Sequence, residues 1–128
     1  MANKVTLEAL LERKLTKEVK TKGTYTSKIL GADIEFNKKT LQEVTEIMDK
    51  YPGRTNAEGL KGNCMMILKH CPIFQEKELQ EAYGVGEPWE VVSKVFDENN
   101  KEIRELVETI LGLYGLIEEE VDVEAVKN

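Results

Sequence analysis

Cys64, His70 and Cys71 are the residues whose types and spacing come nearest to a metal site in this chain. Their surroundings have helical periodicity, which would place the two cysteines on one helix face about 10 Å apart. Zinc bonds sulfur at about 2.3 Å, so the pair cannot share an ion without further ligands. No CxxC or HxxxH motif supplies such ligands. We therefore expect two buried, free cysteines in an apolar stripe, and neither a metal ion nor another cofactor.

His70 is the only histidine and the natural candidate for a general base. A general base needs a partner that orients it and a substrate proton within reach, and the sequence nominates neither. Because the residue falls in the last turn of a predicted helix, where the backbone dipole favours a cation, we expect a capping or solvent-exposed role. A small enzyme with Cys64 or Cys71 as nucleophile is an alternative, which rapid alkylation of the native thiols would favour.

Two further motifs are weaker candidates for chemistry. The Gly-Val-Gly sequence at 84–86 follows a predicted helix, lacks the third glycine of a dinucleotide-binding loop and precedes Glu87, which would repel a phosphate. The acidic run at 118–120 lies in a tail that we expect to be unstructured, where nothing would bury a carboxyl group. The sequence thus favours a protein that is not an enzyme.

Length and charge favour one domain. A chain of 128 residues has the usual size of a single domain and needs no metal or disulfide to fold. Its net charge of −6 argues against nucleic-acid binding, since phosphate neutralisation requires clustered Lys and Arg. The sequence has no apolar run long enough to cross a membrane and no apolar core of a signal peptide. Together with the two cysteines, this predicts a cytoplasmic protein with free thiols.

Charge is unevenly distributed along the chain. Residues 1–28 carry seven basic and three acidic side chains, whereas residues 116–128 carry five acidic and one basic. The two ends could therefore attract one another within or between molecules, and such attraction would weaken as salt is added. The alternative is that both ends are solvated tails.

The apolar periodicity predicts a mainly α protein, a compact bundle of about five to six short helices with a small N-terminal β-hairpin. We expect one domain over 1–128. Residues 1–36 would form a helix at 6–13 and a hairpin at 27–36 with its turn at Gly31, residues 40–115 the helical core, and residues 116–128 an acidic flexible tail. An isolated hairpin is barely stable in water, so it must pack on the helices or on a partner's sheet edge.

Local signals place the boundaries of the core helices. Thr40 with Glu43, and Thr55 with Glu58, have the spacing of capping boxes. Pro88 is expected to be the first residue of a later helix. The last helix, starting at one of two adjacent asparagines, has an unbroken apolar face of Ile103, Leu106, Val107, Ile110, Leu111 and Tyr114.

Six residues are candidates for contact with another protein, namely Met65, Met66, Phe74, Tyr83, Pro88 and Trp89. The two methionines fall largely off the apolar stripe of their predicted helix, and the other four would line one groove. Aromatic residues and methionine are enriched where proteins meet, because they provide contact area at low entropic cost. The alternative is that these side chains complete the core.

The order of the segments carries a further signal. A leucine-rich N-terminal helix, a lysine-rich segment and a Leu-Gly hairpin precede a helix with Ile47-Met48-Asp49. The later motifs are Leu68-Lys69-His70-Cys71-Pro72, Lys77-Glu78-Leu79-Gln80-Glu81-Ala82-Tyr83-Gly84-Val85, Glu87-Pro88-Trp89-Glu90-Val91-Val92 and Leu111-Gly112-Leu113. Over nearly the whole chain, this order resembles the XkdN-like tail assembly chaperones of Gram-positive phages and defective prophages.

The resemblance implies a mainly helical protein, made late in infection, that coats or binds the tape-measure protein while the tail tube polymerises around it. Such chaperones are absent from the finished virion, and the family has no accepted catalytic residues. The client would be a long helical chain with exposed apolar stripes, prone to aggregation until it is covered.

Covering such a client takes many copies of a small acidic protein, and weak contacts suffice if the copies also touch one another. We therefore expect self-association, through the hairpin edge or the oppositely charged termini. The alternative function is a generic helical protein-interaction adaptor or regulatory subunit. A neighbouring tape-measure gene would favour the chaperone, and a metabolic operon would favour the adaptor.

Overall fold

The computed structural model describes residues 4–16 and 21–116. It is mainly helical with a two-stranded antiparallel hairpin near the N-terminus, which confirms the predicted fold class. The predicted acidic tail, apart from its first residue, lies outside the described residues. The elements in chain order are α1 (Leu7–Thr16), β1 (Lys22–Ser27), β2 (Ala32–Asn37), α2 (Leu41–Lys50), α3 (Asn56–His70), the 3-10 helix η1 (Pro72–Gln75), α4 (Lys77–Ala82), α5 (Glu90–Val95) and α6 (Asn100–Gly112).

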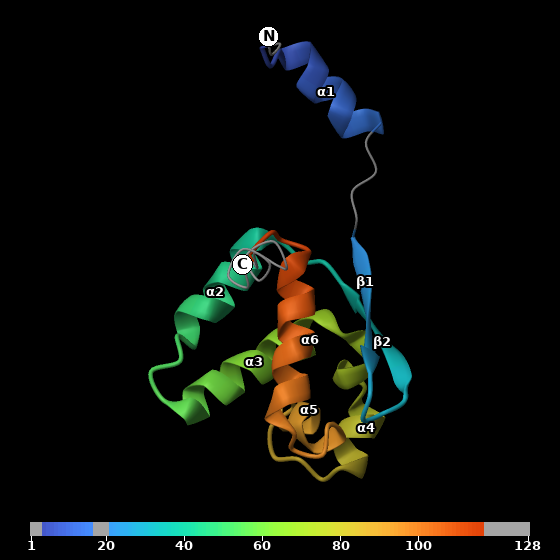
Figure 1. The fold of residues 1–128 in the computed structure, drawn as a ribbon, viewed down its shortest axis with the longest axis vertical. Coiled ribbons are helices and arrows are strands. Elements are labelled where there is room, and N and C mark those ends of the chain that lie inside the picture. The colour runs from blue at the N-terminus through green and yellow to red at the C-terminus, as the bar shows by residue number, and fades with distance from the viewer. Residues whose placement is uncertain (1–3, 17–20, 117–128) are drawn as a thin grey trace, which may run out of the picture.

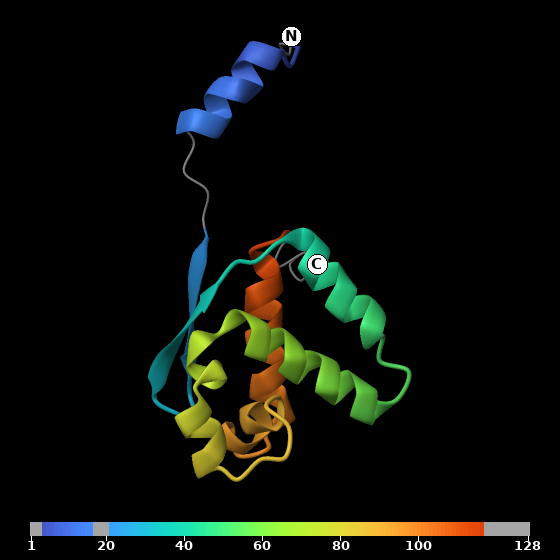
Figure 2. The ribbon, with the colours of Figure 1, turned by 180° about the vertical axis from the view of Figure 1, so that it is seen from behind.

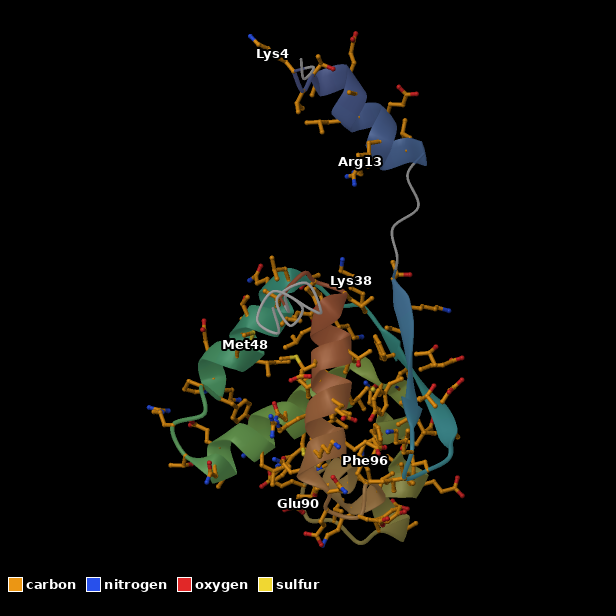
Figure 3. All side chains as sticks on the ribbon, viewed as in Figure 1. Lys4, Arg13, Lys38, Met48, Glu90 and Phe96 are labelled. Atoms are coloured by element: carbon orange, nitrogen blue, oxygen red, sulfur yellow. The ribbon has the colours of Figure 1, made fainter. Side chains whose placement is uncertain are left out.

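α3 and α6 cross at the centre of the fold, and α2, α5 and the hairpin pack around them (Figure 1). Of the apolar series predicted for the last helix, Ile103, Leu106, Val107 and Ile110 are buried in α6, whereas Leu111 and Tyr114, which follows the helix, are half-buried. Phe96, directly after α5, points into the same core (Figure 3). In the described part of the chain, no helix has both the length and the apolar character needed to cross a bilayer. The core is formed by Ile34, Phe36, Val44, Cys64, Met66, Ile67, Cys71, Phe74, Val91, Val92, Phe96, Ile103, Leu106, Val107 and Ile110.

Capping residues fix where α2 and α3 begin. The Thr40 hydroxyl accepts the N–H of Glu43 at 3.1 Å, and the Glu43 carboxylate accepts the N–H of Thr40 at 3.3 Å, so the predicted box is complete. At α3 only half of the second box forms. Thr55 accepts the N–H of Glu58 at 3.1 Å, but the Glu58 carboxylate instead accepts the N–H of Arg54 at 2.8 Å.

The start of α5 differs from the prediction. The helix begins at Glu90, and Pro88 lies in the turn before it, where its carbonyl accepts the N–H of Val91 at 3.2 Å. The Glu90 carboxylate accepts the N–H groups of Gly86 and Glu87, at 2.9 Å and 3.2 Å. These two bonds hold the preceding residues in a turn, which shifts the first helical residue downstream.

The first strand of the hairpin lies earlier than predicted. β1 occupies Lys22–Ser27 and pairs with β2 from Lys22 opposite Asn37 to Ser27 opposite Ala32. The turn itself is at the predicted place, with Gly31 at a φ of 64°. The first strand was not predicted at these residues because one of its inward-facing positions is a glycine, which interrupts the alternation of apolar and polar side chains. Gly23 lies under the ring of Phe36, where a Cβ would come within 2.4 Å of a ring carbon.

Two carboxylates of α6 fasten the hairpin to the core. Glu102, only 6% exposed, accepts hydrogen bonds from the Ser27 hydroxyl and, at 3.3 Å, from the N–H of Ile29. One turn later, Glu105 accepts a 3.0 Å hydrogen bond from the Tyr25 hydroxyl. Burial and this bond to Glu105 raise the pKa of the Tyr25 phenol. The hairpin thus packs on the helices, one of the two arrangements that its marginal stability required.

α1 lies apart from the core. It extends beyond the N-terminal end of β1, away from α2 to α6, in both views (Figures 1 and 2). Its described side chains are all exposed, and the core contains none of them. The helix is longer than predicted, and Thr6 caps it by accepting the N–H of Ala9 at 3.2 Å.

Candidate protein-interaction surfaces

A groove of about 600 Å³ lies between β2 on one side and η1 and α4 on the other, and we call it the β2–α4 groove. Its volume is within the range of ligand-binding clefts. The buried side chains of Ile34 and Phe74 line it at depth. Nearer solvent, Leu30, Ile73 and Tyr83 are exposed by 42%, 53% and 46%. The groove therefore offers an apolar surface that the described part of the chain leaves open.

The charge around this groove is of one sign. Asp33 and Glu35 on β2 and Glu76 before α4 contribute carboxylates. Among the described residues that line the groove, none is Lys or Arg. Asp33 accepts a 2.7 Å hydrogen bond from the Thr26 hydroxyl, which holds this carboxylate at the hairpin. An apolar partner with positive charge would match these features best.

A second apolar surface is the side of α1 that carries Leu7, Leu10, Leu11 and Leu15, which we call the leucine face. These side chains are between 53% and 85% exposed. Helical geometry places Lys14 within the same face and Ala9 opposite it. Arg13 lies at the edge of the leucine face, on the side of Leu10. Glu8 and Glu12 lie along the opposite edge, on the side of Leu15, so the leucine face is apolar with Lys14 within it and charges of opposite sign along its two edges.

The six predicted binding residues do not form one surface. Phe74 and Tyr83 both line the β2–α4 groove, whereas Pro88 and Trp89 do not. Pro88 lines a separate depression of about 210 Å³ beside α4. The prediction that these four residues share one groove is therefore wrong, because the turn before α5 carries Pro88 and Trp89 away from it. Trp89 instead lies half-buried beneath Lys61, whose Nζ is 5.6 Å from the ring centroid.

The two methionines have different environments. Met65 is half-buried and lines a depression of about 270 Å³ between α2 and α3. Met66 is 3% exposed and belongs to the core, so the prediction that it contacts a partner is wrong. Its burial follows from the position of α3, which packs against α2, α5, η1 and α6 and therefore buries more than one stripe.

Cys64 and Cys71 are free and fully buried, as predicted. Burial raises the pKa of each thiol to about 12. At neutral pH both therefore stay protonated, in a form that is a poor nucleophile and a poor metal ligand. Among the described residues, no group of three or more His, Cys, Asp or Glu side chains is placed to hold a metal ion.

His70 is buried, which contradicts the predicted capping or solvent-exposed role. It is 1% exposed, and its Nδ1–H donates to the Met66 carbonyl at 2.7 Å. Its Nε2 accepts from the Tyr114 hydroxyl at 2.8 Å, and that hydroxyl oxygen accepts the N–H of Lys39 at 2.6 Å. Burial lowers the pKa of the imidazole. The residue therefore serves as a neutral link between α3, the end of α6 and the segment before α2.

The sequence-based prediction missed the residues that make the two apolar surfaces. The leucines of α1 were assigned to one side of a helix in a bundle, and Ile73 was not singled out. One signal for the first was available, because α1 carries charged residues at 8, 12, 13 and 14 and is joined to the hairpin by a lysine-rich segment with no apolar period. Ile73 gave no such signal, since its exposure depends on the packing of η1 against β2.

Comparisons of this chain with protein-family models, with curated proteins and with solved structures found no match.

Proposed function

We propose that this protein is a non-enzymatic chaperone of phage or prophage tail assembly, which binds the tape-measure protein in the cytoplasm of the bacterial host. The proposal combines the order of sequence motifs, which resembles the XkdN-like chaperones, with one structural observation. That observation is the leucine face of α1, four large apolar side chains displayed on a helix outside the core.

Such a face is suited to a helical client. Apolar patches on a small protein usually mark a surface that another molecule covers. An amphipathic helix covers such a patch by laying its own apolar stripe against it, and a tape-measure chain would offer many such stripes.

The energies favour weak individual contacts. Burying four leucines contributes about 6–12 kcal/mol at the usual 1.5–3 kcal/mol for each. Association costs about 4–15 kcal/mol in lost translational and rotational freedom. The two ranges nearly cancel, so one α1 helix would hold its client loosely, and many copies on one long client would bind through avidity.

Co-expression with the tape-measure protein of the same gene cluster tests this function. We expect the native protein to increase the soluble fraction of the tape-measure protein and to be recovered with it in a pull-down. Leu11→Asp combined with Leu15→Asp should abolish both effects. Ala9→Asp, which places the same charge on the opposite side of α1, should leave them unchanged.

One outcome of the co-expression experiment would contradict the proposed function. If the tape-measure protein stays insoluble and is not recovered with the native protein, the proposed function is wrong, and a helical adaptor for another partner becomes the better explanation. Equal loss with the Ala9→Asp control would mean that the leucine face is not the surface that binds the client.

A further inference from the structure

The β2–α4 groove and α1 match in length. The groove follows β2, whose six residues span about 17–20 Å at about 3.3 Å per residue. α1 has ten residues and is therefore about 15 Å long at 1.5 Å per residue. A helix of this length lies along the strand without projecting beyond either end, and only its leucine side chains need to enter the groove.

The two surfaces also match in chemistry. The leucine face is apolar with Lys14 within it, Arg13 at one edge and Glu8 and Glu12 at the other, whereas the groove is apolar with carboxylates at its rim. Lys and Arg side chains can lie along apolar surface while their charged ends reach outward, here toward Glu35 and Glu76. Opposite charge at the rim sets the orientation of such a contact more than its strength.

Neither surface is covered by the described residues of its own chain. α1 extends beyond the N-terminal end of β1, whereas α4, which forms one side of the groove, lies at the opposite end of the molecule (Figures 1 and 2). We propose that the leucine face of α1 in one copy docks into the β2–α4 groove of a second copy. Each copy has one such helix and one such groove, so the contact is heterologous and builds open chains or closed rings.

This contact does not depend on the identity of the client. It replaces the two modes of self-association expected from the sequence, the hairpin edge and the charged termini, with a defined pair of surfaces. It also gives the leucine face a sheltered position in the absence of other partners. A helical client would then compete with the second copy for the same leucines.

Analytical ultracentrifugation of the full-length protein, from micromolar to millimolar concentration, tests the contact. We expect the average mass to rise with concentration. Leu11→Asp on α1 and Ile73→Asp in the groove should each weaken self-association by about tenfold or more. Both native side chains are more than half exposed, so the fold should tolerate the changes. Ala9→Asp on the opposite side of α1 and Met48→Asp on α2 are the matched controls, expected to behave like the native protein.

Mixing the two defective variants is the decisive step. The Leu11→Asp variant keeps an intact groove and the Ile73→Asp variant an intact leucine face, so together they can make one productive contact. At a concentration at which each variant alone is monomeric, we expect the mixture to form one-to-one pairs and nothing larger. Leu30→Asp provides a second groove variant should Ile73→Asp alter the circular dichroism spectrum.

Three results would overturn the proposal. The first is a native protein that is monomeric at all concentrations. The second is a mixture of the two variants that stays monomeric. The third is a groove variant that self-associates like the native protein, which would indicate pairing between two α1 helices instead. None of these results bears on client binding, which the co-expression experiment measures separately.

Discussion

The Nε2 atom of His70 lies 2.8 Å from the Tyr114 hydroxyl, and the two rings meet edge to face at 81° with centroids 5.7 Å apart. The carbonyl of Met66 can only accept, so Nδ1 carries the proton and Nε2 must accept from Tyr114. A chain of three hydrogen bonds, from the Lys39 N–H through Tyr114 and His70 to Met66, thereby connects three segments. Its members lie far apart in the sequence, so the chain holds the end of α6 against α3.

Tyr114→Phe should test this connection. The change keeps the ring but leaves His70 Nε2 without a donor and the Lys39 N–H without an acceptor, which should lower the free energy of unfolding by about 1–3 kcal/mol. Urea denaturation would measure the loss. Tyr83→Phe, at an exposed tyrosine in the groove, is the control and should change stability by less than about 0.5 kcal/mol. Equal effects of the two changes would contradict the role assigned to Tyr114.

Stability should also fall as the solution becomes more acidic. Burial is the largest cause that lowers the pKa of His70 below 6.5, with Lys39 acting in the same direction, while the Met66 hydrogen bond and Glu43 act against it. Below about pH 6.5 the unfolded chain therefore binds a proton that the folded protein does not, so the free energy of unfolding decreases as pH falls.

Denaturation between about pH 7.5 and pH 5 would measure this slope. His70 is the only histidine, so the His70→Gln variant lacks the main group that titrates in this interval. We expect the free energy of unfolding of the variant to depend less steeply on pH, whatever its overall stability. If the free energy of unfolding changes with pH in the same way for the native protein and the variant, His70 is not the cause of the pH dependence.

Glu102→Ala should loosen the hairpin. The change removes the acceptor for the Ser27 hydroxyl and the N–H of Ile29, which are buried or half-buried. Because hydrogen bonds to a charged group are the stronger kind, we expect the free energy of unfolding to drop by about 2–3 kcal/mol. Hydrogen exchange of the β1 and β2 amides should become faster than that of α3. Glu108→Ala, at an exposed glutamate on the same helix, should have little effect on either measurement.

Two glycines should respond in opposite directions to replacement by alanine. A Cβ at Gly23 would approach a ring carbon of Phe36 to 2.4 Å, so Gly23→Ala should destabilise the protein by about 1–3 kcal/mol. Gly59 lies within α3 with open space around it, so Gly59→Ala should stabilise by up to about 1 kcal/mol. The Tm of each variant, compared with that of the native protein, tests both expectations. Similar shifts in Tm would rule out the close contact with Phe36.

The parts of the fold that local sequence determines were predictable. α2, α3 and α6 are capped by Thr40, Thr55 and Asn99, and each capping side chain accepts a backbone N–H from two or three residues further along the chain. The buried face of α6 could be predicted from the spacing of its apolar residues alone. These features need no knowledge of distant segments, which is why sequence periodicity was sufficient for them.

The features that were not predicted depend on contacts between distant residues. His70 was assigned to solvent because its partner Tyr114 is 44 residues away and gives no local signal. Met66 was assigned to a binding surface because nothing in α3 indicates that neighbours lie on several of its sides. The open groove arises only where β2, η1 and α4 meet, so its lining could not be gathered from any one segment.

The fastening of Ser27 by Glu102 has a consequence for synthesis of the chain. The glutamate is translated 75 residues after the serine, so the nascent hairpin emerges from the ribosome long before its anchor exists. A hairpin alone is barely stable. Stable folding of the hairpin therefore waits for the last helix to be made. A message truncated before α6 would release a product without that anchor, open to proteolysis from its N-terminal end.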